Sequence, residues 1–325
     1  MGATLAVPVA LEGRALHAGL PVRVVLLPRD EPGIIFRRRD LPGSPSLPAE
    51  VASLAGPDAD TARRTCLRHG TASVDTVEHL LAACFGLGIT SLAVDVSGPE
   101  LPIGDGSARL WVDAIGRAGR RSAPDMPLAA LPGGLPHPVV VRDAAGRRIT
   151  VAPAATWSVH FAGVFPDGRR HEARWTPATD FAAELADART FCRLSEVAEL
   201  RRAGLIRGGG PENALVWVDL PITNELARQI ATWWPGVELV AGPDGLLASQ
   251  RLRRPDEPAR HKLVDLMGDL ALLALAPSPR AATVLGPCRV EAVQAGHDLA
   301  HRLLREIARA MDGQSGAQGR RRKDW

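Results

Sequence analysis

Residues 4–55 alternate between apolar and polar positions in short runs that proline and glycine interrupt. The clearest runs are formed by the apolar residues Leu5, Val7, Val9 and Leu11, and by Val22, Val24 and Leu26. A period of two is typical of strands with one buried face. The start of the chain therefore predicts a series of strands.

The pattern changes to helical spacing at residues 75–85, where Gly86 stands just past the expected end of a helix. A strand is expected through Leu92–Val96, and a second helix at 110–118. Residues 119–136 are rich in arginine, proline and glycine, which predicts a linker.

The second half repeats the order of strands followed by helices. Strands are expected at 138–142, 148–153, 157–164 and 214–218, and helices at about 179–187, 194–203, 258–275 and 297–311. This order predicts an α+β fold of two domains, each with helices on one face of a sheet. We place the domains at residues 1–122 and 123–312, with an insertion at about 220–240 and a disordered basic tail at 313–325.

Composition narrows the class of protein. The chain of 325 residues is 46% apolar and 23% charged, which is ordinary for a globular protein, and its formal charge of +3 is too small to favour nucleic acid. We find no signal peptide and no apolar stretch long enough to cross a bilayer. The four cysteines form no CxxC pair, which suits reduced thiols. We expect a cytoplasmic protein without stable membrane insertion.

Lysine is nearly absent from the chain. Among 39 basic residues only Lys262 and Lys323 are lysines. A bias towards arginine explains the rest of the surface but does not explain why Lys262 is retained.

The expected helix at 258–275 carries a polar stripe. At ~100° per residue, His261, Asp265 and Asp269 fall within about 80° of one another, opposite the apolar side. Histidine and aspartate at i and i+4 suit two ligands of one metal ion. Gly268 lies in the stripe, where a missing side chain allows a close approach. The alternative is a solvated polar face.

A second cluster comprises Asp75, Glu78 and His79. Asp75 and Glu78 have the spacing of a capping box, and His79 also fits a buried structural histidine. The same Glu-His pair would serve a zinc hydrolase, with an imidazole ligand beside a carboxylate that takes a proton from water.

The third cluster, Gly296-His297-Asp298, opens an amphipathic helix. The helix dipole disfavours a cationic histidine at this end. If His297 acts as an acid, a nearby carboxylate must hold its proton, and Asp269 is the natural candidate. The chain has no phosphate-binding loop, no GxSxG motif and no zinc-finger spacing.

Taken together, these clusters and their flanks resemble the UDP-3-O-acyl-N-acetylglucosamine deacetylase family. The resemblance is carried by Leu16-His17, 33–41, 77–83, 86–89, 98–103, 105–108, Ala188-Arg189-Thr190-Phe191, Arg260-His261-Lys262, Asp265, Gly268-Asp269 and Gly296-His297. It covers nearly the whole chain to about residue 311. The family fold consists of two α+β domains packed as a β-α-α-β sandwich, with the active site between them.

The resemblance implies a zinc-dependent amidohydrolase that commits its substrate to lipid A synthesis. One Zn²⁺ per chain would be held by His79, His261 and Asp265. Glu78 would be the general base, and His297, oriented by Asp269, would protonate the leaving amine. The substrate would be a UDP-linked acylated glucosamine, and we expect a monomer.

The resemblance also implies contacts to the substrate. Thr190 would help to bind the oxyanion, and Lys262 would face the phosphates, where a point charge is not interchangeable with a guanidinium. Phe191, Phe165 and Leu16 would complete the substrate-binding surface.

Two stretches depart from the family pattern. Cys192-Arg193 replace a glycine and a bulky apolar residue beside the expected acyl passage. The expected insertion contains an amphipathic segment that ends in Trp233-Trp234, either a surface helix or an added wall for the acyl chain. Two other functions remain open: a paralogue that deacylates another sugar nucleotide, and a non-catalytic glycolipid-binding protein.

Overall fold

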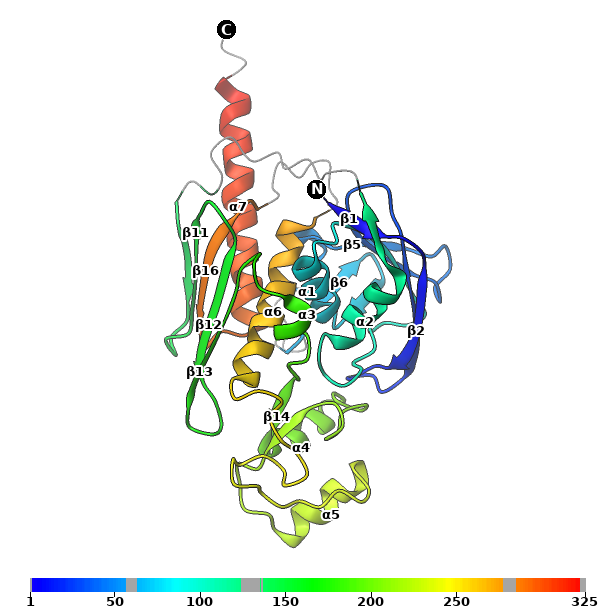
Figure 1. The fold of residues 1–325 in the computed structure, drawn as a ribbon, viewed down its shortest axis with the longest axis vertical. Coiled ribbons are helices and arrows are strands. Elements are labelled where there is room, and N and C mark those ends of the chain that lie inside the picture. Colours follow the sequence, from blue (N-terminus) through cyan, green and yellow to red (C-terminus); the bar gives the residue numbers. More distant parts are fainter. Residues whose placement is uncertain (1, 57–62, 124–134, 136, 277–284, 322–325) are drawn as a thin grey trace.

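Two five-stranded sheets enclose a layer of helices (Figure 1). The computed structural model describes residues 2–56, 63–123, 135, 137–276 and 285–321. The first sheet has the order β2-β3-β8-β4-β5 and the second β10-β11-β16-β12-β13. The fold is therefore α+β, as predicted.

Each sheet comes from one half of the chain. The first contains β2 (Val9–Arg14), β3 (Pro21–Leu27), β4 (Gly33–Arg38), β5 (Ser46–Pro48) and β8 (Ser91–Val96). The second contains β10 (Val139–Arg142), β11 (Arg148–Pro153), β12 (Ser158–Val164), β13 (Arg170–Trp175) and β16 (Cys288–Val293).

The two sheets share one topology. In each sheet, the strand that comes last in the chain lies in the middle, pairing parallel with one neighbour (β8 with β4, β16 with β12) and antiparallel with the other. The remaining pairs are antiparallel. This repetition agrees with an internal duplication, which the sequences of the halves do not reveal.

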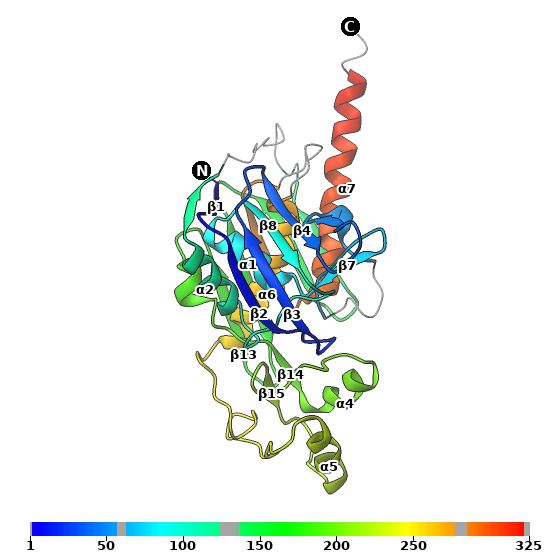
Figure 2. The same cartoon turned by 90° about the vertical axis from the view of Figure 1, so that its right-hand side faces the viewer.

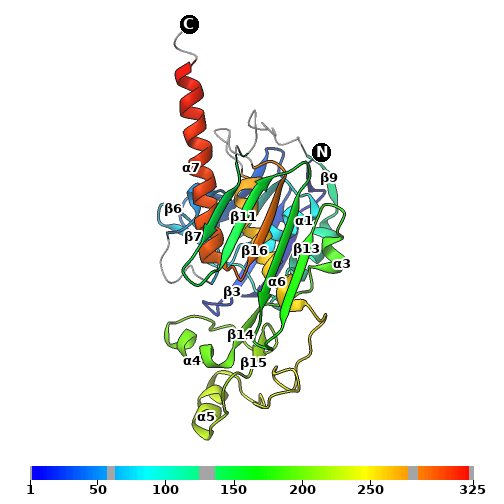
Figure 3. The ribbon, with the colours of Figure 1, turned by 90° about the vertical axis from the view of Figure 1, so that its left-hand side faces the viewer.

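Three helices lie between the sheets: α1 (Glu78–Leu87), α6 (Glu257–Ala274) and the first part of α7 (His297–Arg321), whose C-terminal turns extend beyond the sheets. α1 and α6 pack directly on each other, while α6 and α7 cover the second sheet (Figures 1 and 3). Gly268 of α6 permits the closest approach, because a Cβ there would lie 2.1 Å from the carbonyl oxygen of Glu78. The predicted role of Gly268 is confirmed: it brings the start of α1 against the polar stripe of α6.

The remaining elements lie around this sandwich. A short pair joins β1 (Ala3–Leu5) to β9 (Arg120–Ser122), and β6 (Cys66–His69) pairs with β7 (Ala72–Asp75). α2 (Arg109–Ala118) packs beside β2, and α3 (Phe181–Glu184) beside α1 (Figure 1). A 3-10 turn spans Val51–Ser53.

A smaller unit, residues 191–250, projects below the sandwich (Figures 1 and 2). It contains β14 (Phe191–Arg193), α4 (Leu194–Arg202), β15 (Leu215–Trp217) and α5 (Asn224–Trp233). Its own apolar cluster includes Leu194, Val216, Ile230 and Trp234, all buried. The amphipathic helix predicted before Trp233-Trp234 is therefore present.

Several predicted boundaries were wrong. The first helix begins at Glu78 rather than Asp75, because Asp75 belongs to β7 and Thr76 has a positive φ of 59° that no helix continues. It also runs through Gly86 and ends where Gly88 adopts a left-handed conformation. The helix expected at 179–187 is limited to α3. β13 and β16 were missed, although both alternate between buried and exposed residues.

The predicted linker and tail also differ from the structure. Residues 120–122 form β9, while 124–134 and 136 lie outside the described residues. We expected disorder from residue 313, but α7 continues to Arg321, and 322–325 are not described. A physical reason is that extending an existing helix is far easier than nucleating one. The domain boundary at 122/123 stays a prediction.

Candidate active site

A cavity of about 500 Å³ opens between the sandwich and the 191–250 unit. Every predicted site residue except Asp269 lines it. The residues in question are Leu16, Glu78, His79, Phe165, Thr190, Phe191, His261, Lys262, Asp265 and His297. The fold thus gathers residues that are up to 281 positions apart, the separation of Leu16 and His297.

The first cluster in the cavity is formed by His79, His261 and Asp265. Their ligand atoms lie within 4.8 Å of one another, and all three residues are buried. Nε2 of His261 is 3.3 Å and Nε2 of His79 is 3.6 Å from Oδ1 of Asp265. The solvated polar face that we considered for α6 is wrong, because its stripe faces this buried cluster.

Proton positions decide what this cluster binds. Nδ1 of His261 lies 3.0 Å from the carbonyl oxygen of Ala188, which can only accept, so Nδ1 carries the proton. Burial lowers the pKa of His261 to about 4, which leaves its ring neutral and its Nε2 with a lone pair. Nε2 of His261, an oxygen of Asp265 and a ring nitrogen of His79 lie close together around one point. Two imidazoles and a carboxylate are a ligand set that fits zinc.

Glu78 stands beside this cluster and is 3% exposed. One of its oxygens accepts a hydrogen bond of 3.1 Å from the backbone N–H of Thr65. The capping-box alternative is therefore wrong: Val77 holds the N-cap position of α1, and no side-chain cap forms there. Burial raises the pKa of Glu78, which favours its use as a base near neutral pH.

His297 and Asp269 form a buried pair. Nδ1 of His297 lies 2.8 Å from Oδ2 of Asp269, as predicted, and the two side chains are 4% and 1% exposed. Burial opposes the charge on His297, but the carboxylates of Asp269 and Asp265 outweigh it and raise the pKa to about 9. The other ring nitrogen, Nε2, is directed into the cavity, 3.9 Å from Glu78 and 3.7 Å from Asp265. This geometry suits a proton donor facing a base.

Lys262 has a partner within the protein. Its Nζ lies 2.7 Å from Oδ2 of Asp265 and 5.6 Å from the ring centre of Phe191. Its charge therefore compensates the carboxylate of the first cluster. The predicted contact with a phosphate stays a prediction.

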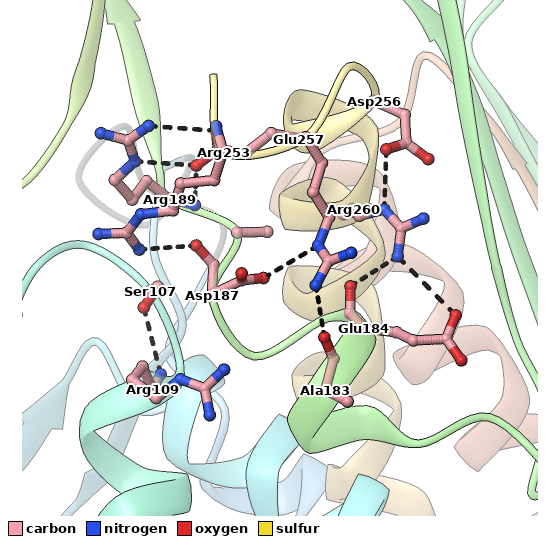
Figure 4. A network of polar contacts seen from close by, with 12 residues as sticks. Ser107, Arg109, Ala183, Glu184, Asp187, Arg189, Arg253, Asp256, Glu257 and Arg260 are labelled. Carbon is pink, nitrogen blue, oxygen red and sulfur yellow. Dashed lines mark hydrogen bonds and ion pairs between the residues drawn. The ribbon is translucent and has the colours of Figure 1, made fainter. Parts of the chain in front are cut away.

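Arg189, which precedes Thr190 and Phe191, belongs to an ionic network at the start of α6 (Figure 4). Arg189 makes a 2.8 Å contact with Glu257, whose side chain is 1% exposed, and also donates its backbone N–H to that carboxylate. Thr190 then donates its backbone N–H to Gly106 at 2.7 Å. The two halves of the chain therefore fix the position of Thr190 together.

The far end of the cavity belongs to the 191–250 unit. Leu200, Ile206, Val216 and Trp234 give it apolar walls, and Trp234 donates its indole N–H to the Gly209 carbonyl at 2.7 Å. Cys192 and Arg193, the residues that depart from the family pattern, line the cavity too. Trp233 does not line it and lies under Arg201, 5.7 Å from the guanidinium to the ring centre.

Sequence reasoning missed three polar residues that support the site. Glu100 accepts hydrogen bonds from the backbone N–H groups of His17 and Ala18, both at 2.8 Å, and so fixes the loop that carries Leu16. Thr65 and His301 contact Asp269 behind His297. His301 had a signal, since it follows His297 at i+4, but nothing marked Thr65.

With this geometry established, comparison with known proteins places the chain. The family model for UDP-3-O-acyl N-acetylglycosamine deacetylase matches residues 2–230 and 237–309. The chain belongs to this family. Relatives named UDP-3-O-acyl-N-acetylglucosamine deacetylase include proteins of Phenylobacterium zucineum and Nostoc sp., both 36% identical. The first alignment covers 95% of this chain and 94% of the relative, and the second covers 84% and 89%. A relative from Synechocystis sp. is 33% identical over 95% of this chain and 99% of its own length.

Membership in the deacetylase family also bears on two expectations. The family model leaves residues 231–236 of the 191–250 unit unmatched, and the insertion expected at about 220–240 stays a prediction. The resemblance inferred from the motifs is confirmed. Within the described residues, no helix is long and apolar enough to span a membrane.

Proposed function

We propose that this chain hydrolyses the N-acetyl group of a UDP-3-O-acyl-N-acetylglucosamine, releasing acetate and the free amine, the step that commits the substrate to lipid A synthesis. Family membership makes the chain a deacetylase. The observation that carries the proposal is the convergence of a buried base, a buried acid and a metal-ligand set in one cavity.

We further propose that His79, His261 and Asp265 hold one Zn²⁺. When bound, zinc supplies a Lewis acid that lowers the pKa of a water molecule and polarises the amide carbonyl. The ligand set supports zinc because imidazole nitrogen and carboxylate oxygen are both its usual partners.

In the proposed reaction, Glu78 and His297 each carry out one proton transfer. Glu78 takes a proton from the attacking water, and the proton on Nε2 of His297 goes to the amide nitrogen as the C–N bond breaks. Asp269 holds Nδ1 of His297 and so keeps Nε2 directed at the substrate. Thr190, fixed by Gly106, is placed to stabilise the charge that develops on the carbonyl oxygen.

The same cavity supports a site for the acylated sugar nucleotide. Lys262 contributes an ammonium group, which suits a diphosphate, and Phe191, Phe165 and Leu16 contribute apolar surface near the reaction centre. The apolar end at Val216 and Trp234 suits an acyl chain.

The proposal is tested by incubating the purified protein with UDP-3-O-acyl-N-acetylglucosamine and measuring acetate and the free amine. The expected result is one acetate per amine, with Glu78→Gln as an inactive control that remains folded. If wild-type protein reconstituted with Zn²⁺ released no acetate from this substrate but bound it, the non-catalytic alternative would replace the enzyme.

A further inference from the structure

Behind the proposed acid, a second polar cluster joins four buried residues that come from three parts of the chain. Asp269 comes from α6, His297 and His301 come from successive turns of α7, and Thr65 precedes β6. Thr65 is fully buried, and His301 is 3% exposed. Buried polar groups of this kind require partners, and here they provide them for one another.

The donor and the acceptor of each hydrogen bond between Thr65, Asp269 and His301 can be assigned. The Thr65 hydroxyl donates to Oδ1 of Asp269, and it has only one proton to give. Nε2 of His301, 2.9 Å from the same hydroxyl oxygen, must therefore be the donor to it. Nε2 of His301 also lies 3.5 Å from Oδ1 of Asp269.

The two oxygens of Asp269 therefore accept hydrogen bonds from different groups. Oδ1 accepts from the Thr65 hydroxyl, which in turn accepts from Nε2 of His301, while Oδ2 accepts from Nδ1 of His297. Contacts at Oδ1 fix the rotation of the carboxylate about its Cβ–Cγ bond. That rotation decides where Oδ2 lies and therefore where the imidazole of His297 is directed.

Thr65 also contacts the base. Its backbone N–H donates to Oε2 of Glu78 at 3.1 Å, and its carbonyl accepts from the N–H of Val77 at 3.3 Å. A single residue therefore contacts both Glu78 and the partner of His297. Its hydroxyl contacts Asp269, the partner of the proposed acid His297, and its backbone N–H contacts Glu78, the proposed base.

We propose that Thr65 and His301 are positioning residues, which hold the Asp269 carboxylate so that His297 faces the substrate across from Glu78. This rests on the proposed function, because it assigns His297 the acid role. Neither residue touches the cavity or the metal-ligand set.

The test compares variants that remove or retain each hydrogen bond. Thr65→Val keeps the shape of the side chain and its backbone contact to Glu78 but removes the hydroxyl, while Thr65→Ser retains it. His301→Phe removes the ring nitrogen, and His301→Gln keeps a donor of similar reach. Thr4→Val is the matched control, because Thr4 is also fully buried and accepts a hydrogen bond from the backbone of Arg29, away from the cavity.

We expect Thr65→Val and His301→Phe to lower kcat on the order of tenfold with KM unchanged, as for a misplaced catalytic group. Thr65→Ser and His301→Gln should recover most of that loss, and Thr4→Val should keep wild-type kcat. Zinc content and Tm, measured on each variant, identify any variant that has lost its fold.

A double-mutant cycle separates positioning from general damage. If Thr65 acts through Asp269, then Thr65→Val in the Asp269→Asn background should have little further effect on kcat. Fully additive losses, or a Thr65→Val enzyme with wild-type kcat, would overturn the inference while an active wild type still upheld the deacetylase function. An inactive wild type would count against the proposed function itself.

Discussion

Two clusters of the same residue types lie side by side in this molecule and have opposite proton arrangements. His79, His261 and Asp265 form one, and Asp269, His297 and His301 form the other; in each, the ligand atoms lie within 4.8 Å of one another and all residues are buried. In the first, the neutral His261 directs a lone pair at the carboxylate side of the cluster. In the second, protons from His297 and Thr65 already occupy the carboxylate of Asp269.

The comparison shows that ligand type and burial do not by themselves define a metal site. A cation takes the place of missing protons, so we propose the metal at the first cluster, where the unprotonated Nε2 of His261 faces Oδ1 of Asp265 while the ammonium of Lys262 contacts the other carboxylate oxygen. The cluster that satisfies its own acceptor is suited to holding a proton for transfer. The carbonyl of Ala188 is decisive for the first cluster, because it fixes which nitrogen of His261 is free.

The largest effect is expected from removing the metal. Treatment with a strong chelator should abolish deacetylation, because the proposed reaction needs the Lewis acid that the metal supplies. Adding Zn²⁺ should restore the activity. Full turnover in protein shown to be free of metal would refute the assignment.

A smaller but still large effect is expected for the base. Glu78→Gln should keep zinc bound and lower kcat by about 10²-fold or more, since a positioned general base is lost while the ligands are intact. Metal analysis and steady-state kinetics on the same preparation check this. Loss of zinc in Glu78→Gln would instead make Glu78 part of the metal centre.

The pH profile reports on the proposed acid and the proposed base. His297 must be protonated to act as an acid, and its pKa is raised to about 9, so activity should fall as pH rises through that value. Glu78 must be deprotonated, and burial raises its pKa, so activity should also fall towards acid, at a pH above the ordinary range of a carboxyl group.

Asp269→Asn sharpens this profile. It removes the carboxylate that does most to raise the pKa of His297, so the alkaline limb should move to lower pH while the acid limb stays. An unchanged alkaline limb in Asp269→Asn would mean that His297 does not set it.

The smallest effect is expected at the apolar end of the cavity. Trp234→Ala should reduce kcat/KM for substrates with long acyl chains more than for short ones, because Trp234 lines the cavity. Trp233→Ala is the matched control, since Trp233 lies outside the cavity wall. Equal effects of Trp234→Ala on all chain lengths would make Trp234 a packing residue of its unit only.

The sequence predicted the elements of the fold better than their ends. Helical spacing located α2, α4 and α6 to within about two residues: α2 and α4 each have an apolar face, and α6 has apolar residues opposite its polar stripe. The start of α1 was misplaced because the positive φ of Thr76 comes from its tertiary setting, where its hydroxyl donates to the buried Glu100. No local pattern indicates such a turn.

The residues of the site also include some that the sequence predicted and some that it did not. His261, Asp265 and Asp269 were accessible to sequence reasoning because one helix presents them at i, i+4 and i+8. Whether that stripe faces solvent or a second helix depends on the contact between Gly268 and Glu78, which only the fold provides. Thr65 was out of reach, because a lone threonine in a loop carries no spacing signal.

Zinc stoichiometry after dialysis of three proteins determines whether the first cluster or the second holds the metal. Wild type and His301→Phe should each retain about one Zn²⁺ per chain, while His261→Ala should retain essentially none. Loss of zinc in His301→Phe with retention in His261→Ala would contradict the account.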